Sequence, residues 1–151
     1  MTKQRLAQGA TLLVVAALGA AVALRDRAPE PQPQDAVYRM MDAARAGDAQ
    51  EYLSQFTGAM ETSLRRMAAE QGGDAFAAYL RNTNAAIKGV AVMDPEPVGE
   101  GVVKLRVEYV YQDRNEAQTL SLIRVGEQWK IAQMDVAGRV RTLIPYGTPV
   151  Q

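Results

Sequence analysis

The sequence predicts an α+β protein in which amino-terminal helices pack on a curved, four-stranded antiparallel sheet, preceded by one transmembrane or signal helix. Three observations predict this fold class. A stretch of 19 residues near the amino terminus has no charged side chain, apolar residues then recur at helical spacing as far as residue 83, and from residue 87 they alternate with polar ones. Helices followed by a run of strands are typical of an α+β domain.

The uncharged stretch runs from Leu6 to Leu24, with basic residues on both sides. As a helix it would be about 28 Å long, which matches the hydrocarbon core of a bilayer. Residues 1–27 are therefore interpreted as a transmembrane anchor. A cleaved signal peptide is the alternative, because Lys3 and Arg5 form a basic start and the sequence ending at Ala23 reads A-x-A.

The next seven residues, 28–34 (APEPQPQ), contain three prolines and predict a semi-rigid linker of roughly 20 Å. A domain over residues 35–135 and a carboxyl-terminal tail over 136–151 follow. Because basic residues flank both ends of the uncharged stretch, the positive-inside rule does not indicate which end of the helix would lie in the cytoplasm. The linker and polar domain indicate a single-pass cell-membrane protein with its domain on the extracytoplasmic side, or a secreted or periplasmic protein after cleavage following Ala23.

Four helices are expected between residues 35 and 83. Asp35 opens the first and Gly47 ends it, Asp48 begins the second, and glycines at 58 and 72–73 end the second and third. Residues three and four apart share a helix face. The residues expected to face inward are, in order, Val37, Met40, Met41 and Ala44; Tyr52, Leu53 and Phe56; Met60, Leu64 and Met67; Phe76, Tyr79, Leu80 and Thr83.

Four strands follow, over residues 87–93, 102–112, 116–125 and 128–135. Residues 94–97 (DPEP) are expected to break the sheet after the first strand, and turns are expected at 113–115 and 126–127. Alternation places the odd-numbered residues 103 to 111 of the second strand on one face. In the last strand it places Trp129, Ile131 and Gln133 on one side.

Composition excludes several kinds of chemistry. The chain has no cysteine and no histidine, which excludes thiol catalysis, imidazole acid–base catalysis and thiolate or imidazole metal sites. From residue 35 onward, 13 basic and 15 acidic residues give a net charge of 13 − 15 = −2, and no basic run appears. Nucleic acid is therefore not an expected partner. No metal site or cofactor is expected.

Three stretches of the chain share their pattern with a known family. Residues 43–57 (AARAGDAQEYLSQFT) form a helix, a Gly-Asp break and a second helix; residues 102–113 (VVKLRVEYVYQD) form a long strand; residues 121–134 (SLIRVGEQWKIAQM) form a hairpin. Together they resemble the nuclear-transport-factor-2-like superfamily, a cystatin-like α+β cone, and most closely its lumazine-binding-like and uncharacterised membrane-tethered bacterial members. The tail after Val136 has no counterpart there.

This resemblance implies a pocket between the helices and the concave face of the sheet. Enzymes of the superfamily place a carboxylate base there, with a tyrosine or another acid. Alternation along the predicted strands places one carboxylate, that of Asp135, on the inner face of the sheet. Asp135 lies at the fraying end of its strand, however, so a surface position without a catalytic role is the simpler interpretation. No catalytic residue is therefore assigned. Side chains that could line a ligand pocket, or alternatively fill the core, are Tyr38, Tyr52, Tyr79, Tyr109, Tyr111, Trp129 and Gln133.

Three functions remain open from the sequence. A membrane-tethered extracytoplasmic interaction or scaffold domain without catalysis is favoured, because no chemistry is evident. A small-ligand-binding domain using the cone's cavity is the alternative, and an isomerase or dehydratase-type enzyme is the second alternative. The expected partners are the membrane, through residues 6–24, and a protein or a second copy of the chain, through the sheet. Val140, Leu143 and Ile144 of the tail are expected to cover a sheet face or a partner.

Overall fold

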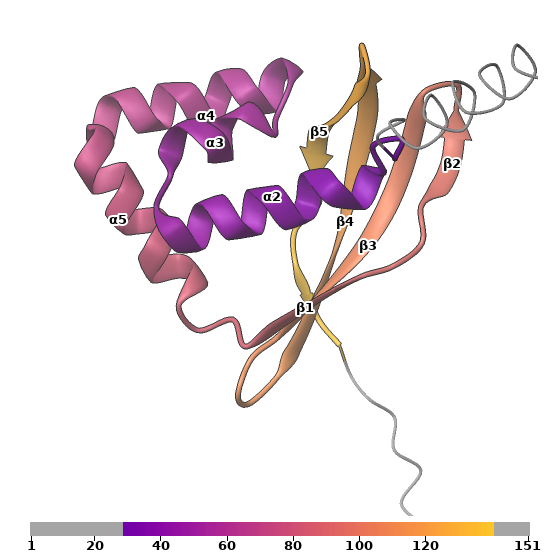
Figure 1. Ribbon diagram of the computed structural model, residues 1–151. Helices are drawn as coiled ribbons and strands as arrows, with labels where there is room; N and C mark the ends of the chain where they lie inside the picture. Colours follow the sequence, from indigo (N-terminus) through magenta and orange to yellow (C-terminus); the bar gives the residue numbers. More distant parts are fainter. Residues whose placement is uncertain (1–28, 141–151) are drawn as a thin grey trace, which may run out of the picture. The chain divides into compact units, whose positions relative to one another are not determined.

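A computed structural model describes residues 29–140 of the chain (Figure 1). The described helices and strands belong to one compact unit that begins at Pro31. Within residues 29–140, no helix is both long and apolar enough to cross a membrane. The predicted anchor or signal segment lies outside the described residues, as do Leu143 and Ile144 of the tail.

The helices are α2 (Pro33–Ala46), α3 (Ala49–Ser54), α4 (Gly58–Gln71) and α5 (Gly73–Asn84). Helix α2 begins two residues before the expected Asp35, because Pro33 occupies its first turn, where a missing N–H is harmless. The Asp35 carboxylate accepts a hydrogen bond from the backbone N–H of Gln32 at 2.8 Å. At the start of α3, the Asp48 side chain accepts from the Glu51 N–H at 2.9 Å, so the predicted cap is confirmed.

The strands are β1 (Gly89–Val92), β2 (Glu96–Gly99), β3 (Val102–Val110), β4 (Asn115–Val125), β5 (Gln128–Met134) and β6 (Gly138–Arg139). All pairings are antiparallel, in the order β1-β3-β4-β5, with β2 also paired to β3 and β6 also paired to β4. The predicted count of four strands is wrong, since the described sheet has six. It is still four positions wide, because β1 and β2 share one edge of β3 while β5 and β6 share one edge of β4.

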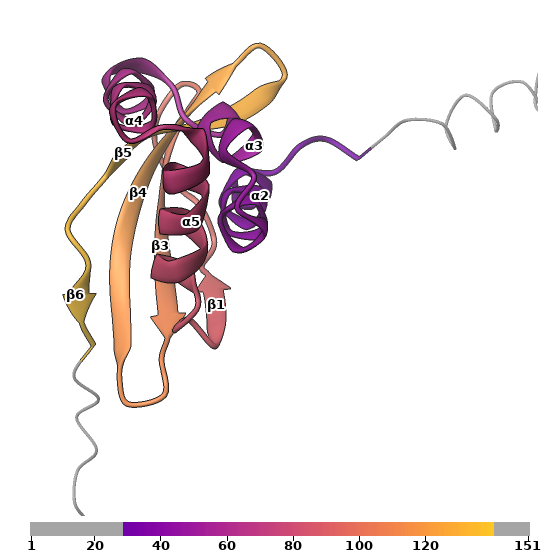
Figure 2. The ribbon, with the colours of Figure 1, turned by 90° about the vertical axis from the view of Figure 1, so that its left-hand side faces the viewer.

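The helices cover one face of this curved sheet (Figure 2). The main core cluster joins α2 to the inner faces of β3, β4 and β5, and Leu105, Leu120, Leu122 and Ile131 in it are completely buried. A second cluster joins Ala44, Leu53, Phe76 and Leu80 between the helices. The molecule is thus a two-layer domain with its apolar side chains between the layers.

Three expected inward positions on the helices are wrong. Met67 on α4 is 38% exposed and Tyr79 on α5 is 46% exposed. Helix α4 has no fully buried residue, because it is the outer helix of the layer and contributes Met60 and Leu64 only at the edge of the core. The other residues of the predicted stripes of α2, α3 and α5 pack inward, except Thr83, which is mainly exposed.

Strand β5 contains a bulge that changes which residues face the core. Leu122 pairs with Ile131, but the adjacent Ser121 pairs with Gln133, so Ala132 is an extra residue. A bulge of one residue reverses the alternation beyond it. Gln133 is therefore exposed rather than inward, and the expected common face of Trp129, Ile131 and Gln133 is wrong at its third member.

Candidate functional site

A partly open cavity of about 200 Å³ lies between the helical layer and the inner face of the sheet, and it is called the central cavity below. Its apolar wall consists of Met40, Met41, Ala44, Ile87 and Met134. Its polar lining includes three tyrosines (Tyr52, Tyr109 and Tyr111) together with Asn84, Glu116 and Gln118. An apolar cavity of roughly 150 Å³ can hold benzene. The central cavity is therefore large enough for one substituted ring.

The register of β3 and β4 places the polar groups in this cavity. Tyr109 pairs directly with Glu116, and Val107 pairs with Gln118. Directly opposed residues of an antiparallel pair point to the same face of the sheet. Because Tyr109 and Val107 are buried on the inner face, Glu116 and Gln118 must also face inward.

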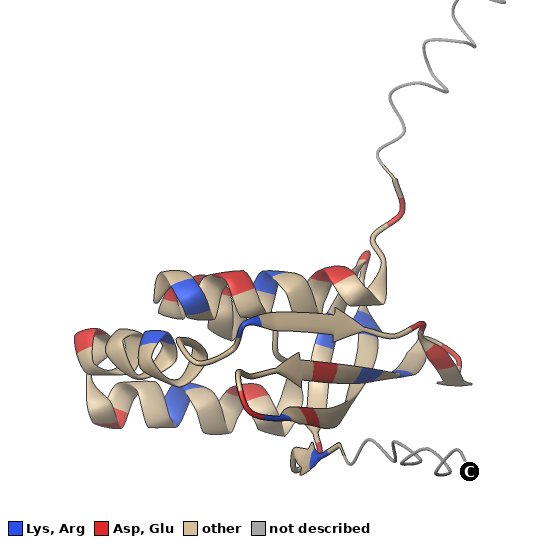
Figure 3. Cartoon of the chain, turned by 90° about the horizontal axis from the view of Figure 1, so that it is seen from below, with Lys and Arg blue, Asp and Glu red and all other residues tan. Residues whose placement is uncertain are grey.

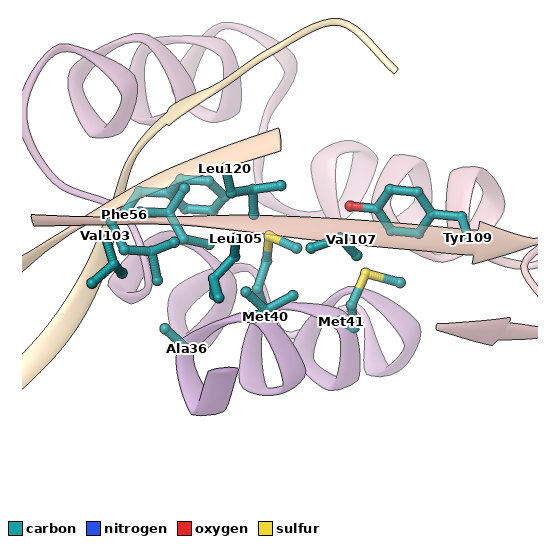
Figure 4. Close-up of a cluster of buried hydrophobic side chains, with 12 residues drawn as sticks. Ala36, Met40, Met41, Phe56, Val103, Leu105, Val107, Tyr109 and Leu120 are labelled. Carbon is teal, nitrogen blue, oxygen red and sulfur yellow. The ribbon is translucent and has the colours of Figure 1, made fainter. Parts of the chain in front are cut away.

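A chain of hydrogen bonds fixes the polar groups on the sheet side. The Tyr109 hydroxyl donates to Oε1 of Gln118 at 3.0 Å, and Nε2 of Gln118 donates to the backbone carbonyl of Asp135. Tyr109 is the one member of the main core cluster whose side chain carries an oxygen, and Figure 4 shows it at the same end of that cluster as Met41. Because the Asp135 carbonyl can only accept, the amide nitrogen of Gln118 must face it, and the amide oxygen of Gln118 faces Tyr109.

Burial keeps two of the cavity hydroxyls protonated. It raises the pKa of Tyr52 to about 12, with a smaller contribution from the nearby Tyr79. It also raises the pKa of Tyr109 to about 12, with smaller contributions from Tyr52 and Tyr111. Tyr52 and Tyr109 both line the central cavity. Both are neutral groups able to donate a hydrogen bond at neutral pH.

Glu116 at the polar end of the cavity is one member of an ion pair. Nε of Arg114 lies 2.6 Å from Oε1 of Glu116, and the Arg114 guanidinium lies 4.2 Å from the centre of the Tyr111 ring. The pKa of Tyr111 is raised, first by desolvation and then by the negative charge of Glu116, while Arg114 opposes the shift. The Glu116 carboxylate is therefore paired and hydrogen-bonded with Arg114.

The structure brings three of the seven predicted lining residues together, Tyr52, Tyr109 and Tyr111. The other four lie elsewhere. Tyr38 is 45% exposed on α2, and Tyr79 stacks on Phe76 with ring centres 6.2 Å apart. Trp129 lines a smaller hollow of about 90 Å³ with Arg39 of α2. Gln133 lies beyond the bulge, with its side chain at the surface.

Sequence reasoning missed Glu116 and Gln118. The signal was present, because Leu120 and Leu122 have the same parity on β4 and are completely buried. Asp135, the one carboxylate expected to have inward parity, is exposed, since it too follows the bulge at Ala132. The inward carboxylate of the described domain is Glu116. In residues 29–140 no group of three or more acidic side chains is placed to hold a metal ion.

Comparisons with known proteins give a likeness of fold. No protein-family model and no curated protein matches the chain. The structure is similar to a cystatin-like protein from Ruminococcus gnavus ATCC 29149, with a TM-score of 0.50 and 16% identity over 74% of this chain and 41% of that one. The expected cystatin-like α+β fold is therefore confirmed as a fold.

Two further solved structures have lower TM-scores. An NTF-2 like protein of unknown function from Silicibacter pomeroyi DSS-3 has a TM-score of 0.45 and 16% identity, over 71% of this chain and 92% of that one. A DUF4783 family protein from Bacteroides ovatus ATCC 8483 has a TM-score of 0.43 and 12% identity, over 69% of this chain and 94% of that one. At these identities no activity, ligand or partner follows for this chain.

Proposed function

We propose that this protein is a small-ligand-binding domain that uses the central cavity. One observation carries the proposal: the helices and the sheet leave about 200 Å³ unfilled at a place lined by tyrosine hydroxyls, an amide and thioethers. Protein interiors normally pack without voids much larger than a water molecule. A concave, mainly apolar site with a few convergent polar groups is typical of ligand binding.

The cavity favours ligand binding over the scaffold function that the sequence alone favoured. A scaffold domain needs only its outer surface, so its core could close completely, whereas this core stays open beside Tyr109. An enzyme of the isomerase or dehydratase type is less well supported. Its base would be Glu116, and that carboxylate is already paired with Arg114 at 2.6 Å.

A filled-cavity variant tests the proposal. Ala44 is 1% exposed and lines the cavity, so Ala44→Leu would place additional carbon atoms in it. Ala46→Leu on the exposed side of the same helix is the matched control. With the purified full chain, toluene and indole should raise the thermal midpoint of the wild type and of Ala46→Leu, but not that of Ala44→Leu. Equal shifts in all three proteins, or none in the wild type, would contradict ligand binding in this cavity.

A tethered interaction module is the second candidate, and the outward face of the sheet favours it. Val102 pairs with Ile123 on that face, and Val125 beside them is 47% exposed. A protein partner or a second copy of the chain could bury these side chains. Sedimentation of the wild type and of Ile123→Lys would decide this. A dimer or complex that the substitution dissociates supports the module, and a wild-type monomer that pulls down no partner counts against it.

Tethering through residues 6–24 is part of the same proposal. The test is the mass of the mature protein in membrane and soluble fractions of its host. An intact chain in the membrane fraction supports an anchor, and a soluble product that begins at Leu24 supports the signal-peptide alternative.

A further inference from the structure

We infer that the central cavity takes an uncharged planar ring whose edge carries a hydrogen-bond acceptor next to a donor, as in a cyclic amide. This inference depends on the proposed function and gives it a ligand class. It follows from the size of the cavity, the charge of its lining and the hydrogen bonds that its lining leaves unfilled.

Size limits the ligand to one ring with a small substituent. The cavity measures about 200 Å³, against roughly 150 Å³ for a cavity that holds benzene. The wall facing the ring consists mainly of methionine side chains from α2 and β5. Thioethers adapt their shape and contact aromatic rings favourably, so a planar ring fits this wall better than a branched aliphatic group.

Charge excludes an ionised ligand. Among the described residues that line the cavity, Glu116 is the one with a formal charge, and Arg114 neutralises it at 2.6 Å. An anion would meet this carboxylate and no free cation in the lining. A cation would have to share this carboxylate with Arg114, which also pairs with Asp113 at 3.0 Å. Burying an unpaired charge is unfavourable enough to cancel the affinity of so small a ligand. Figure 3 shows acidic and basic residues intermixed along the described helices and strands.

The hydrogen bonds define the edge of the ligand. The Tyr109 proton is used on Gln118, whose amide is fixed by the Asp135 carbonyl, so the Tyr109 oxygen keeps its lone pairs and can accept. Tyr52 lines the cavity and makes no hydrogen bond to another described residue, so its proton can be donated. The cavity lining thus includes a free donor at Tyr52 and a free acceptor at Tyr109, and the complementary ligand edge is a carbonyl next to an N–H.

Matched probes test this on the full chain by calorimetric titration. The first pair is 2-pyridone and N-methyl-2-pyridone. The ring N–H of 2-pyridone can donate a hydrogen bond to the Tyr109 oxygen, and the N-methyl form has no such donor. The second set is benzamide, benzoate and benzylammonium, which differ in charge. We expect 2-pyridone to bind about tenfold more tightly than its N-methyl form, which corresponds to one hydrogen bond. Benzamide should bind, and neither ion should.

Two tyrosine variants complete the test. Tyr52→Phe should lower the affinity for 2-pyridone about tenfold while leaving toluene binding unchanged, and Tyr38→Phe, on the exposed side of α2, should change neither. If toluene binds but the two pyridones bind equally, or benzoate binds as well as benzamide, the ligand class is wrong and the proposed function stands. If no probe binds the wild type, both are wrong.

Discussion

Because of the hydroxyls of Tyr52 and Tyr109, the stability of the domain should fall at alkaline pH. Both have a pKa of about 12 in the folded protein because burial disfavours the phenolate. In the unfolded chain a tyrosine titrates near pH 10. The unfolded state therefore loses these protons first, and the stabilisation, complete below about pH 10, is lost as the pH rises toward about 12.

We expect the thermal midpoint of the wild type to fall between pH 10 and pH 12. The variant Tyr52→Phe/Tyr109→Phe, which has no group to titrate at these positions, should show a smaller fall over the same interval. Tyrosinate absorbance during the titration should show the wild type gaining its last phenolates at a higher pH than the variant. Identical titration curves for the two proteins would contradict the raised pKa values.

Gly47 is required at the end of α2 for two separate reasons. Its φ of 71° lies in the left-handed region, and a Cβ atom there would meet the guanidinium of Arg81. Gly47→Ala should therefore lower the free energy of unfolding by about 1 kcal/mol or more, measured by urea denaturation. Adding Arg81→Ala should restore only the part due to the contact, because the backbone conformation stays unfavourable. Full recovery in the double variant would show that φ is unimportant here.

At the residue scale, the alternation of side chains between the two faces of a strand determined which site residues could be predicted. Tyr109 on β3 and Tyr111, one residue beyond its end, follow simple alternation, and both line the central cavity. Glu116 follows the same rule on β4 and was predictable from Leu120. Gln133 was not, because the extra residue at Ala132 depends on how β5 pairs with β4, and nothing in the local sequence marks it.

A lysine on β5 links the helical layer to the edge of the sheet. Nζ of Lys130 donates to the backbone carbonyl of Ser54 at the end of α3. Beside it, Ile131 and Phe56 form a parallel bridge, in which the Ile131 N–H donates to the Gln55 carbonyl at 2.8 Å. A carbonyl at a helix end has no partner within its helix, so the lysine satisfies an otherwise unpaired group.

Lys130→Met should lower the free energy of unfolding by about 1 kcal/mol, because it removes this hydrogen bond and keeps the apolar stem. Lys104→Met, on the exposed outer face of β3, is the matched control and should change it by less than about 0.5 kcal/mol. Urea denaturation of both variants measures the difference. Equal effects would mean that the bond to Ser54 contributes nothing specific.

At the scale of elements, helices were predicted better than strands. Glycines and the Asp48 cap mark the helix ends in the sequence itself. Strand β2 was missed because Pro97 is typical of a break, yet proline is tolerated on an edge strand, where its missing N–H faces away from the neighbour. Strand β6 was missed because two residues carry no periodicity.

The whole domain has its core on one side of the sheet, and two positions of β4 test this. Leu120 faces the helices and is completely buried, while Ile123 faces outward and is half-buried. Leu120→Ala should lower the free energy of unfolding by about 2–5 kcal/mol, and Ile123→Ala by much less. Comparable losses, measured on the full chain, would mean that residues outside 29–140 or a second molecule cover the outer face.

At this scale the α+β class and the layering were predictable, because the change from helical to alternating periodicity at residues 83–87 is unambiguous. The central cavity was not. Its volume depends on how far α2 and the end of α5 stand from β3 and β4, and that distance depends on many side chains together, including Met40, Met41 and Ile87.

The arrangement of short strands along both borders of the sheet also affects how this protein meets other chains. On one border lie β1 and β2, four residues each, with a proline in the second; on the other, the bridge from Phe56 pairs with the middle of β5 at Ile131. Long unpaired borders recruit foreign strands and start aggregation. Within residues 29–140 neither border offers a long continuous row of free backbone groups. The domain should therefore resist joining other molecules strand to strand, even when it is crowded at high concentration, so that its contacts with other proteins form through side chains.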